Sequence, residues 1–385
     1  MHVVYAREPL PTTMTKSIFL AGPTPRSKDV FGWRDEAMRE LARLGYDGHV
    51  FVPEPADGRW EHEYDPQVEW EEAALNVADC IVFWIPRDLR TMPGFTTNDE
   101  WGFWKNSGKV VLGCPTDAEK VSYQRHYAKK FKVPYFDTLN ATLKAAVERI
   151  GTGALRHGAE TQVPLYVWRH GSFKSWYLGQ KAAGNSLEAA RVLWTFRVGA
   201  KPMVFAWVLH VSVHVASENR VKSNEFVFGR PDISTMVLWN RAETLSDTRV
   251  VLVREFRSPA RTPDGCIHEF PGGSTTDTLK DSFGTALEEL REETGFTIDP
   301  ARVDTHDFRQ MAGTLSSFGA FVYSAEITNE ELALIEWCSD VPRGVKEDSE
   351  QTYVEVVTVG ELISEPKTDW ATLGMLFAVL SKATR

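Results

Sequence analysis

Cysteine is scarce in this chain of 385 residues: the four cysteines, Cys80, Cys114, Cys266 and Cys338, stand far apart. A zinc site or a disulfide framework is marked in a sequence by cysteines in paired spacing. The scattered positions therefore exclude both as the organising feature of the fold. They indicate reduced thiols, which are typical of proteins in the cytoplasm.

Long apolar runs are also missing. No stretch approaches the ~18 uninterrupted apolar residues of a transmembrane helix. The opening segment, MHVVYAREPLPTTMTK, lacks the apolar centre of a secretion signal. We therefore expect a cytoplasmic protein with no membrane as partner, in which roughly the first dozen residues are loosely ordered.

Positive charge is in deficit, because 43 lysines and arginines face 53 aspartates and glutamates, for a net charge of −10. Proteins that bind nucleic acid as their main function need the opposite balance, so we expect small-molecule partners and no nucleic acid. The hydrophobic content of 43% and the charged content of 25% are ordinary for a globular protein. A chain of this length is longer than the ~250–300 residues that a single hydrophobic core usually serves, which predicts two domains.

The first part of the chain alternates strand and helix patterns. Apolar runs at 17–21, 49–52, 78–84 and 109–113 predict strands, and the segments between them predict helices, including 68–77 and 97–106. This alternation is typical of a parallel α/β sheet of the flavodoxin or Rossmann type. Ligands bind at the carboxyl ends of such strands, which places Gly22, Trp84 and the loop through Gly94 on one rim.

Two carboxylates belong to the helices near this rim. Glu100 lies just inside the helix that follows the loop through Gly94, and Glu71 lies near the start of the helix that leads to Asp79. Breaking a glycosidic bond with retention needs one carboxylate as nucleophile and one group that handles the leaving-group proton. Taken singly, each acid also fits a solvated first helical turn.

Three short motifs in order make residues 17 to about 130 similar to the nucleoside 2-deoxyribosyltransferase family, which includes nucleoside and nucleotide N-glycosidases. The motifs are the run FLAGP at 19–23, the acid eight residues before Asp79, and the glycine loop that leads to Glu100-Trp101-Gly102. The resemblance implies that Glu100 is the nucleophile and that Glu71 assists the departing base.

The same resemblance implies a set of substrate contacts. Phe19 stands where many members have a tyrosine, and Gly94 stands where nucleotide-specific relatives carry a phosphate-binding serine. The full set of implied contacts in this part of the chain is Phe19, Gly22, Asp79, Gly94 and Asn98. The base, the sugar, the phosphorylation state, and the choice between transfer and hydrolysis all stay open.

A change of composition predicts the domain boundary. Residues 151–162, GTGALRHGAETQ, have no apolar period and are rich in glycine and polar residues. We therefore expect one domain at 1–150 and a second at 163–385. Residues 163–235 are expected to be a β-rich lead-in to the second domain and to build a homodimer interface.

Residues 271–296 combine a Gly-Gly loop with a helix rich in acids. Glu289, Glu292 and Glu293 are spaced i, i+3 and i+4, so their carboxylates share one helical face. Like charges at i,i+4 cost roughly 0.2–0.5 kcal/mol per pair on a bare helix, and a divalent cation would remove that cost. The run EELREE alone also fits a solvated face.

Together with the strand at 250–253 and the run HEFPGG at 268–273, this stretch resembles the box of the Nudix hydrolases, in their ADP-ribose and nucleotide-sugar pyrophosphatase branch. Glu288 stands where the family pattern has arginine. The resemblance implies Mg²⁺ or Mn²⁺ on Glu289, Glu292, Glu293 and Glu269, substrate contact by Arg257, and catalytic roles for Glu293 and Glu350.

The predicted fold class is α/β throughout: a parallel-sheet domain followed by a Nudix-like α/β/α domain. The predicted function is a bifunctional nucleotide-processing enzyme. Its first half would cleave or transfer an N-glycosidic bond, and its second half would hydrolyse a diphosphate with Mg²⁺. The alternative is that one half, in the first place the C-terminal one, senses a nucleotide or ADP-ribose without catalysis and regulates the other.

Overall fold

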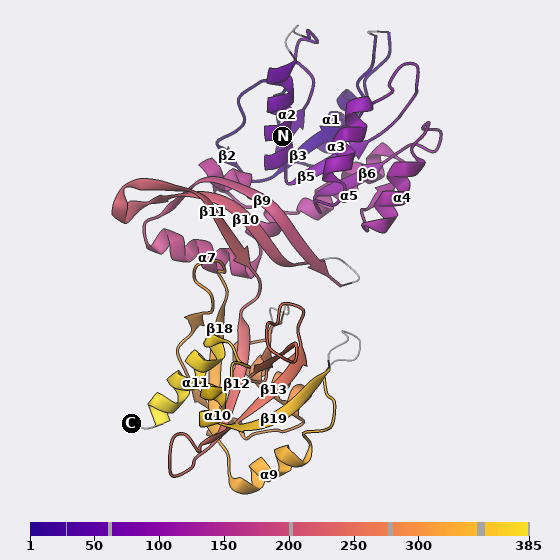
Figure 1. Cartoon of the computed structure of the whole chain (residues 1–385). Helices are drawn as coiled ribbons and strands as arrows, with labels where there is room; N and C mark the ends of the chain where they lie inside the picture. Colours follow the sequence, from indigo (N-terminus) through magenta and orange to yellow (C-terminus); the bar gives the residue numbers. More distant parts are fainter. Residues whose placement is uncertain (28, 61–63, 200–202, 276–279, 345–350, 384–385) are drawn as a thin grey trace. The chain divides into compact units, whose positions relative to one another are not determined.

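The computed structural model describes residues 1–27, 29–60, 64–199, 203–275, 280–344 and 351–383. The chain divides into two compact units, Met1–Phe228 and Gly229–Arg385 (Figure 1). The division falls far from the expected linker at 151–162, which lies inside the first unit. Most of the expected lead-in at 163–235 also belongs to the first unit.

In its described residues, the first unit contains a six-stranded parallel sheet in the order β1-β4-β3-β5-β6-β7. The predicted α/β class with an N-terminal parallel sheet is confirmed. The elements of this part are β1 (His2–Tyr5), β2 (Thr13–Met14), β3 (Ser17–Ala21), α1 (Arg34–Arg43), β4 (His49–Val52), α2 (Asp65–Val77), β5 (Cys80–Trp84), α3 (Phe95–Trp104), β6 (Val110–Gly113), α4 (Ser122–Lys130), β7 (Tyr135–Phe136) and α5 (Leu139–Ile150).

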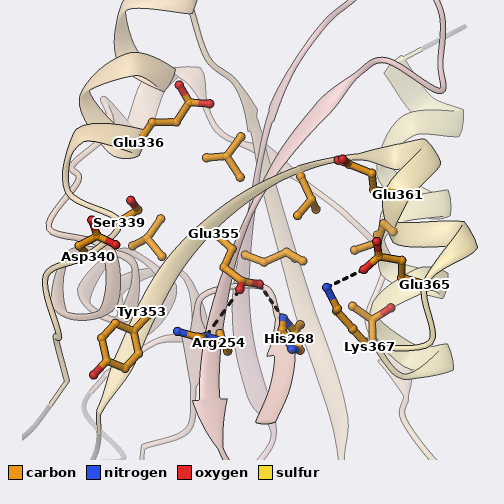
Figure 2. Close-up of a pocket in the computed structure, with 16 residues that line it drawn as sticks. Arg254, His268, Glu336, Ser339, Asp340, Tyr353, Glu355, Glu361, Glu365 and Lys367 are labelled. Carbon is orange, nitrogen blue, oxygen red and sulfur yellow. Dashed lines mark hydrogen bonds and ion pairs between the residues drawn. The ribbon is translucent and has the colours of Figure 1, made fainter. Parts of the chain in front are cut away.

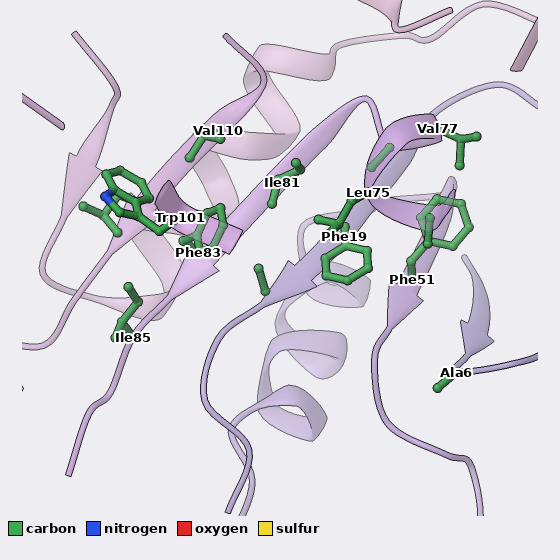
Figure 3. Packing of buried hydrophobic residues seen from close by; sticks show 14 of the residues in the cluster. Ala6, Phe19, Phe51, Leu75, Val77, Ile81, Phe83, Ile85, Trp101 and Val110 are labelled. Atoms are coloured by element: carbon green, nitrogen blue, oxygen red, sulfur yellow. The ribbon is translucent and has the colours of Figure 1, made fainter. Parts of the chain in front are cut away.

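Helices cover both faces of this sheet, which is why its central strands are apolar along their whole length. Residues of α2, α3 and α4 pack on one face together with Phe19, Phe51, Ile81 and Phe83 (Figure 3). Residues of α1 and α5 pack on the other face. The carboxyl ends of β3 and β5 are adjacent, since Ala21 pairs with Phe83.

The first residues of the chain are ordered parts of the fold, which differs from the expectation. β1 pairs in parallel with β4 and extends the sheet, and β2 pairs with β8 (Arg156–His157). Val4 is buried. The short segment HVVY gains its order from the neighbouring strand, because an edge position supplies backbone partners that the sequence alone does not show.

The rest of the first unit adds helices and a second sheet. Its elements are the 3₁₀ helix η1 (Gly158–Gln162), α6 (Leu165–Trp168), α7 (Gly171–Ala182), β9 (Ser186–Val198), β10 (Met203–Val215), the 3₁₀ helix η2 (Ala216–Glu218) and β11 (Arg220–Gly229). The three strands form a sheet in the order β11-β10-β9 within the described residues, in which β9 and β10 are antiparallel. An aromatic core around Phe173 and Trp207 joins α7 to this sheet.

The second unit is built on a mixed sheet whose described strands run β14-β13-β12-β18-β16, with β15, β17 and β19 paired at its sides. Its elements are β12 (Ile233–Asn240), β13 (Arg249–Phe256), β14 (Cys266–Glu269), β15 (Gly272–Gly273), α8 (Ser282–Thr294), η3 (Pro300–Arg302), β16 (Asp304–Thr305), β17 (Arg309–Gln310), β18 (Gly319–Glu326), α9 (Asn329–Trp337), β19 (Thr352–Thr358), α10 (Val359–Ser364) and α11 (Trp370–Ala383).

Helices lie on both faces of this second sheet as well. Ala286 and Leu290 of α8 pack on one face with residues of α9. Leu362 of α10 and Leu376 of α11 pack on the other. The acid-rich helix predicted at 271–296 is α8, and Gly295 ends it in the left-handed conformation, with φ of 70°.

A search of the described residues for a helix of sufficient length and apolar character to cross a membrane finds none.

Candidate functional site

The carboxyl ends of β3 and β5 lie side by side, as predicted, and the two segments approach most closely where Gly22 meets Trp84. A Cβ at Gly22, where φ is +154°, would lie 2.1 Å from the Trp84 carbonyl oxygen. The loops that follow the two strands are joined by a backbone hydrogen bond of 2.9 Å from the Arg26 amide to the Thr91 carbonyl. Only glycine permits this approach of the two strand ends.

Gly94 occupies the position immediately before α3 on this rim. It adopts the left-handed conformation with φ of 64°. A Cβ at this position would lie 3.0 Å from Cβ of Pro23 in the opposite loop. The glycine therefore sets the entry of the chain into α3, and so the direction from which Glu100 reaches the rim.

Glu71 of α2 and Glu100 of α3 are close enough for the charge of Glu71 to act on Glu100. Both side chains are half-buried. The Gln67 side-chain amide donates to Glu71 Oε1 at 2.7 Å, one helical turn away on α2. This hydrogen bond fixes the orientation of the Glu71 carboxyl group.

The two carboxyl groups affect each other's ionisation. Burial raises the pKa of Glu100 to about 8, with a further contribution from the negative charge of Glu71. Burial also raises the pKa of Glu71, against the hydrogen bond from Gln67. The pair therefore retains a proton near neutral pH, which is the arrangement that separates an acid role from a base or nucleophile role.

Arg34 is a site residue that the sequence analysis missed. It is buried in the first turn of α1, and its guanidinium donates to the Gly22 carbonyl at 2.7 Å and to the Leu20 carbonyl at 3.1 Å. It also pairs with Glu54, and its charge lowers the pKa of both Glu71 and Glu100. Its position was a usable signal, because a cation in the first turn opposes the helix dipole and needs another reason to be there.

Phe19 and Asn98, two of the predicted substrate contacts, are engaged with neighbouring side chains. Phe19 is fully buried in β3 and packs against the Trp70 ring at 6.5 Å between centroids. The Asn98 side-chain oxygen accepts from Arg87 at 2.6 Å and from Gln124 at 2.8 Å. Phe19 thus belongs to the apolar core under the sheet, and Asn98 links α3 to Arg87 and Gln124.

Asp79 is not brought to the rim. It precedes β5, at the amino end of the strand, and its carboxylate accepts from Arg156 at 2.8 and 2.7 Å and from the Ser17 amide at 2.9 Å. The Asp79 and Arg156 side chains are both fully enclosed. The predicted substrate contact is replaced by a buried ion pair, because the acid lies one strand length from the carboxyl edge.

In the second unit the predicted acids gather around Glu293. The Glu293 carboxylate accepts from the Gly272 amide at 2.9 Å. Burial raises the pKa of Glu293 to about 9, although this hydrogen bond acts in the opposite direction, and the charges of Glu289, Glu269 and Glu255 raise it further. The Gly-Gly loop and α8 are thus in contact.

The remaining predicted residues of this unit do not complete a metal site. The Glu292 carboxylate lies 3.7 Å from the Arg291 guanidinium. The Arg257 guanidinium forms an ion pair with the Glu255 carboxylate at 2.8 Å. Glu350 lies outside the described residues. Among the residues that the structure describes, no group of three or more His, Cys, Asp or Glu side chains is placed to hold a metal ion.

The second unit also has a cavity of about 520 Å³ along β19, lined by Arg254, His268, Tyr353 and Glu355 among others (Figure 2). His268 donates or accepts on both ring nitrogens, at 2.6 Å to Glu355 and 3.1 Å to Asp264. None of the predicted site residues that the structure describes lines this cavity.

In parallel α/β sheets, small molecules bind beyond the carboxyl ends of the strands, which is where the loops with Gly22 and Gly94 follow β3 and β5. Residues 15–118 match a family model described as "Nucleoside 2-deoxyribosyltransferase like". This match supports a nucleoside-processing role for the N-terminal part of the chain and covers all of β3 to β6. No curated protein matches the chain.

Proposed function

We propose that the N-terminal domain breaks the N-glycosidic bond of a nucleoside or nucleotide, with Glu100 as nucleophile and Glu71 as the acid that assists the base. The observation that carries this proposal is the coupled pair itself: two half-buried carboxyl groups on one rim, one of them with a pKa of about 8. The match of residues 15–118 supports the substrate class.

The chemistry follows from the shared proton. In the reacting form of the pair Glu100 is ionised and Glu71 holds the shared proton. The bond between the sugar C1′ and the base nitrogen then breaks, a bond between C1′ and a Glu100 oxygen forms, and the base leaves with the proton from Glu71. Water then attacks C1′ and releases the sugar, or a second base attacks and completes a transfer. Arg34 favours the ionised form of Glu100, because its charge lowers the pKa of that group.

Release of free base from a panel of nucleosides and nucleotides, followed by mass spectrometry, tests this proposal. Replacing Glu100 by glutamine removes the nucleophile and is expected to lower the rate by roughly 10³-fold or more. Asp99→Asn is the matched control, since Asp99 is the exposed neighbour on the same helix. Base release that is unchanged in Glu100→Gln would refute the site.

Glu71 is tested by its effect on pH dependence. Glu71→Gln is expected to lower the rate by roughly 10²-fold. It also removes the charge that raises the pKa of Glu100, so the remaining activity should reach its maximum at a lower pH. The exposed neighbour supplies the control, Glu72→Gln.

A second proposal concerns the C-terminal unit, namely hydrolysis of a nucleoside diphosphate linked to another group, with Mg²⁺ or Mn²⁺ as the ion. Its support is the contact between the Gly272 amide and Glu293, and the charges of Glu289, Glu269 and Glu255 that act on Glu293. The described carboxylates do not form a metal site as they stand, so no step through a metal is derived. A nucleotide sensor without catalysis is the alternative use of the same residues.

Calorimetry and product analysis distinguish the two uses. A hydrolase is expected to release a nucleoside monophosphate from ADP-ribose only when Mg²⁺ or Mn²⁺ is present, and Glu293→Gln should abolish this release. A sensor would bind ADP-ribose without the ion and leave it intact. Glu330→Gln is the matched control, since Glu330 is exposed on α9 and does not line the cavity along β19.

A further inference from the structure

Five described cations surround a small cavity in the first unit, far from the rim that carries Glu100. The cavity has a volume of about 240 Å³ and is lined by segments at the ends of α3, α4 and α5 and by the end of β9. Val110, the first residue of β6, also lines it, which places the cavity at the amino edge of the sheet. The cations are Lys105, Lys130, Lys132, Arg149 and Arg197.

The charge of this cavity is unbalanced. The chain as a whole carries a net charge of −10, yet no acidic residue is among those described as lining the cavity. Within the described part of the chain, none of the five cations forms an ion pair with a carboxylate. Such a concentration of one sign raises the local concentration of anions.

Arg197 shows that the cavity has a defined construction. Its guanidinium donates to the Ser107 carbonyl at 3.0 Å and lies over the Tyr166 ring at 5.1 Å. It occupies the space beside Gly108, where a Cβ would lie 1.4 Å from a guanidinium nitrogen. Burial lowers the pKa of Arg197, and the charge of Arg149 lowers it further, so a bound anion would relieve both effects.

Cations at helix ends have a simpler role, since they interact favourably with the last carbonyl groups of a helix. Lys105 donates to the Gly102 carbonyl of α3 in this way, whereas Arg149 donates to the carbonyl of Gly108, in the loop between α3 and β6. That role explains Lys105 at its own helix. This role does not explain why cations from the ends of α3, α4 and α5 line the same cavity, and it does not apply to Arg197, which belongs to a strand.

An aromatic cavity of about 470 Å³ adjoins the cationic one, and Asn106 lines both. Its lining includes the rings of Phe103, Trp104, Tyr166 and Trp194, of which Phe103 is 77% exposed and Trp194 is 50% exposed. Exposed aromatic rings beside a groove of positive charge are the features that bind bases and phosphates in single-stranded nucleic acid proteins.

We propose that the two cavities form a nucleotide-binding site separate from the rim of Glu71 and Glu100. The phosphate groups occupy the cationic cavity, which is smaller than the roughly 300–1,000 Å³ typical of a whole small-molecule site. The base stacks in the aromatic cavity, whose volume falls within that range. Trp194 and Arg197 of β9 make the three-stranded sheet part of the site.

The test measures binding of inorganic pyrophosphate, adenosine and adenosine 5′-monophosphate to the full chain, by calorimetry and by tryptophan fluorescence. The double substitution Lys130→Ala and Lys132→Ala is expected to weaken pyrophosphate and monophosphate binding at least tenfold and to leave adenosine binding within twofold. Both lysines are exposed, so the fold should be retained, which the unfolding temperature checks. Lys129→Ala, beside Lys130 but outside the cavity, is the matched control.

Several outcomes would overturn the proposal. It fails if neither pyrophosphate nor the monophosphate binds at millimolar concentration, if the double substitution leaves both affinities unchanged, or if adenosine binds as tightly as its monophosphate. Glu100→Gln separates this site from the rim: binding that depends on Lys130 and Lys132 should persist in that variant. Loss of base release in Glu100→Gln with retained binding keeps the two proposals distinguishable.

Discussion

At the scale of single residues, the chemistry of the N-terminal domain depends on how far Glu100 is removed from water. Its pKa of about 8 has burial as the main cause and the charge of Glu71 as the second. A carboxyl group in this state holds a proton at neutral pH that an exposed glutamate would have released. The same burial that makes the pair useful for proton transfer also makes ionised Glu100 unfavourable for folding.

Glu100→Gln is therefore expected to increase stability at high pH. In the unfolded chain Glu100 ionises near its ordinary pKa of 4.5, and in the folded protein near about 8. The folded state thus holds more protons between these values, so the stability of the wild type falls as pH rises through this window. The variant should be the more stable at pH 9, by on the order of 2 kcal/mol after allowance for partial exposure.

Urea unfolding at pH 4 and pH 9 measures this difference. At pH 4 the protonated wild type and the variant should have nearly equal free energies of unfolding, because both side chains are neutral. Asp99→Asn serves as the control, since that neighbour is exposed. A difference between wild type and Glu100→Gln that does not change with pH would contradict the assigned burial effect.

Asp79 has a structural role that its neighbours define. Asp79→Asn is expected to cost roughly 3–5 kcal/mol in the free energy of unfolding, because it leaves Arg156 charged and buried without its partner. Denaturant unfolding measures the loss. Replacing Arg156 by methionine in the same protein should recover part of the loss, and a cost below 1 kcal/mol would show that the ion pair is dispensable.

At the scale of elements, the junction of β3 and β5 is controlled by one glycine. Gly22→Ala is expected to destabilise the first unit by at least about 2 kcal/mol and to abolish base release, since the new Cβ would lie 2.1 Å from the Trp84 carbonyl oxygen. Thermal unfolding and the base-release assay report the two effects. Gly102→Ala in α3 is the control, because no atom lies within 4 Å of a Cβ there.

The strands and helices also show which elements a hydrophobic pattern can predict. The strands at 17–21, 49–52, 78–84 and 109–113 were predictable because helices cover both faces of the sheet, which makes them continuous apolar runs. β1 and β2 were not, because four residues and two residues are too short for a pattern and take their order from partners elsewhere in the chain. Helices α6 and α7 were hidden in a segment expected to be β-rich.

At the scale of the whole molecule, the position of the division between the two units decides which fragments fold. A fragment of residues 1–228 is expected to unfold cooperatively at nearly the temperature of the first unit in the full chain. A fragment of residues 1–150 lacks Arg156, the partner of Asp79, and β8, the partner of β2. It should lose at least about 3 kcal/mol and fail to unfold cooperatively.

Circular dichroism during thermal unfolding compares the two fragments. Equal cooperativity and equal unfolding temperatures would show that residues 1–150 form an independent domain, as the composition of 151–162 predicts. The composition was misleading for a physical reason. Segments rich in glycine can serve as flexible linkers, but here residues 156–162 form β8 and η1, and Glu160 accepts from the Tyr177 hydroxyl at 2.6 Å.

The amino-acid sequence by itself determined the α/β class and the placement of Gly22 and Gly94 in the loops after two parallel strands, because these depend on local periodicity and on the rule that parallel strands end at one edge. Only the tertiary structure decided the role of Arg34, the withdrawal of Asp79 into an ion pair with Arg156, and the convergence of cations on one cavity. Each of these depends on contacts between residues far apart in the chain, and the free energy of burying a charge is set by such contacts rather than by local sequence.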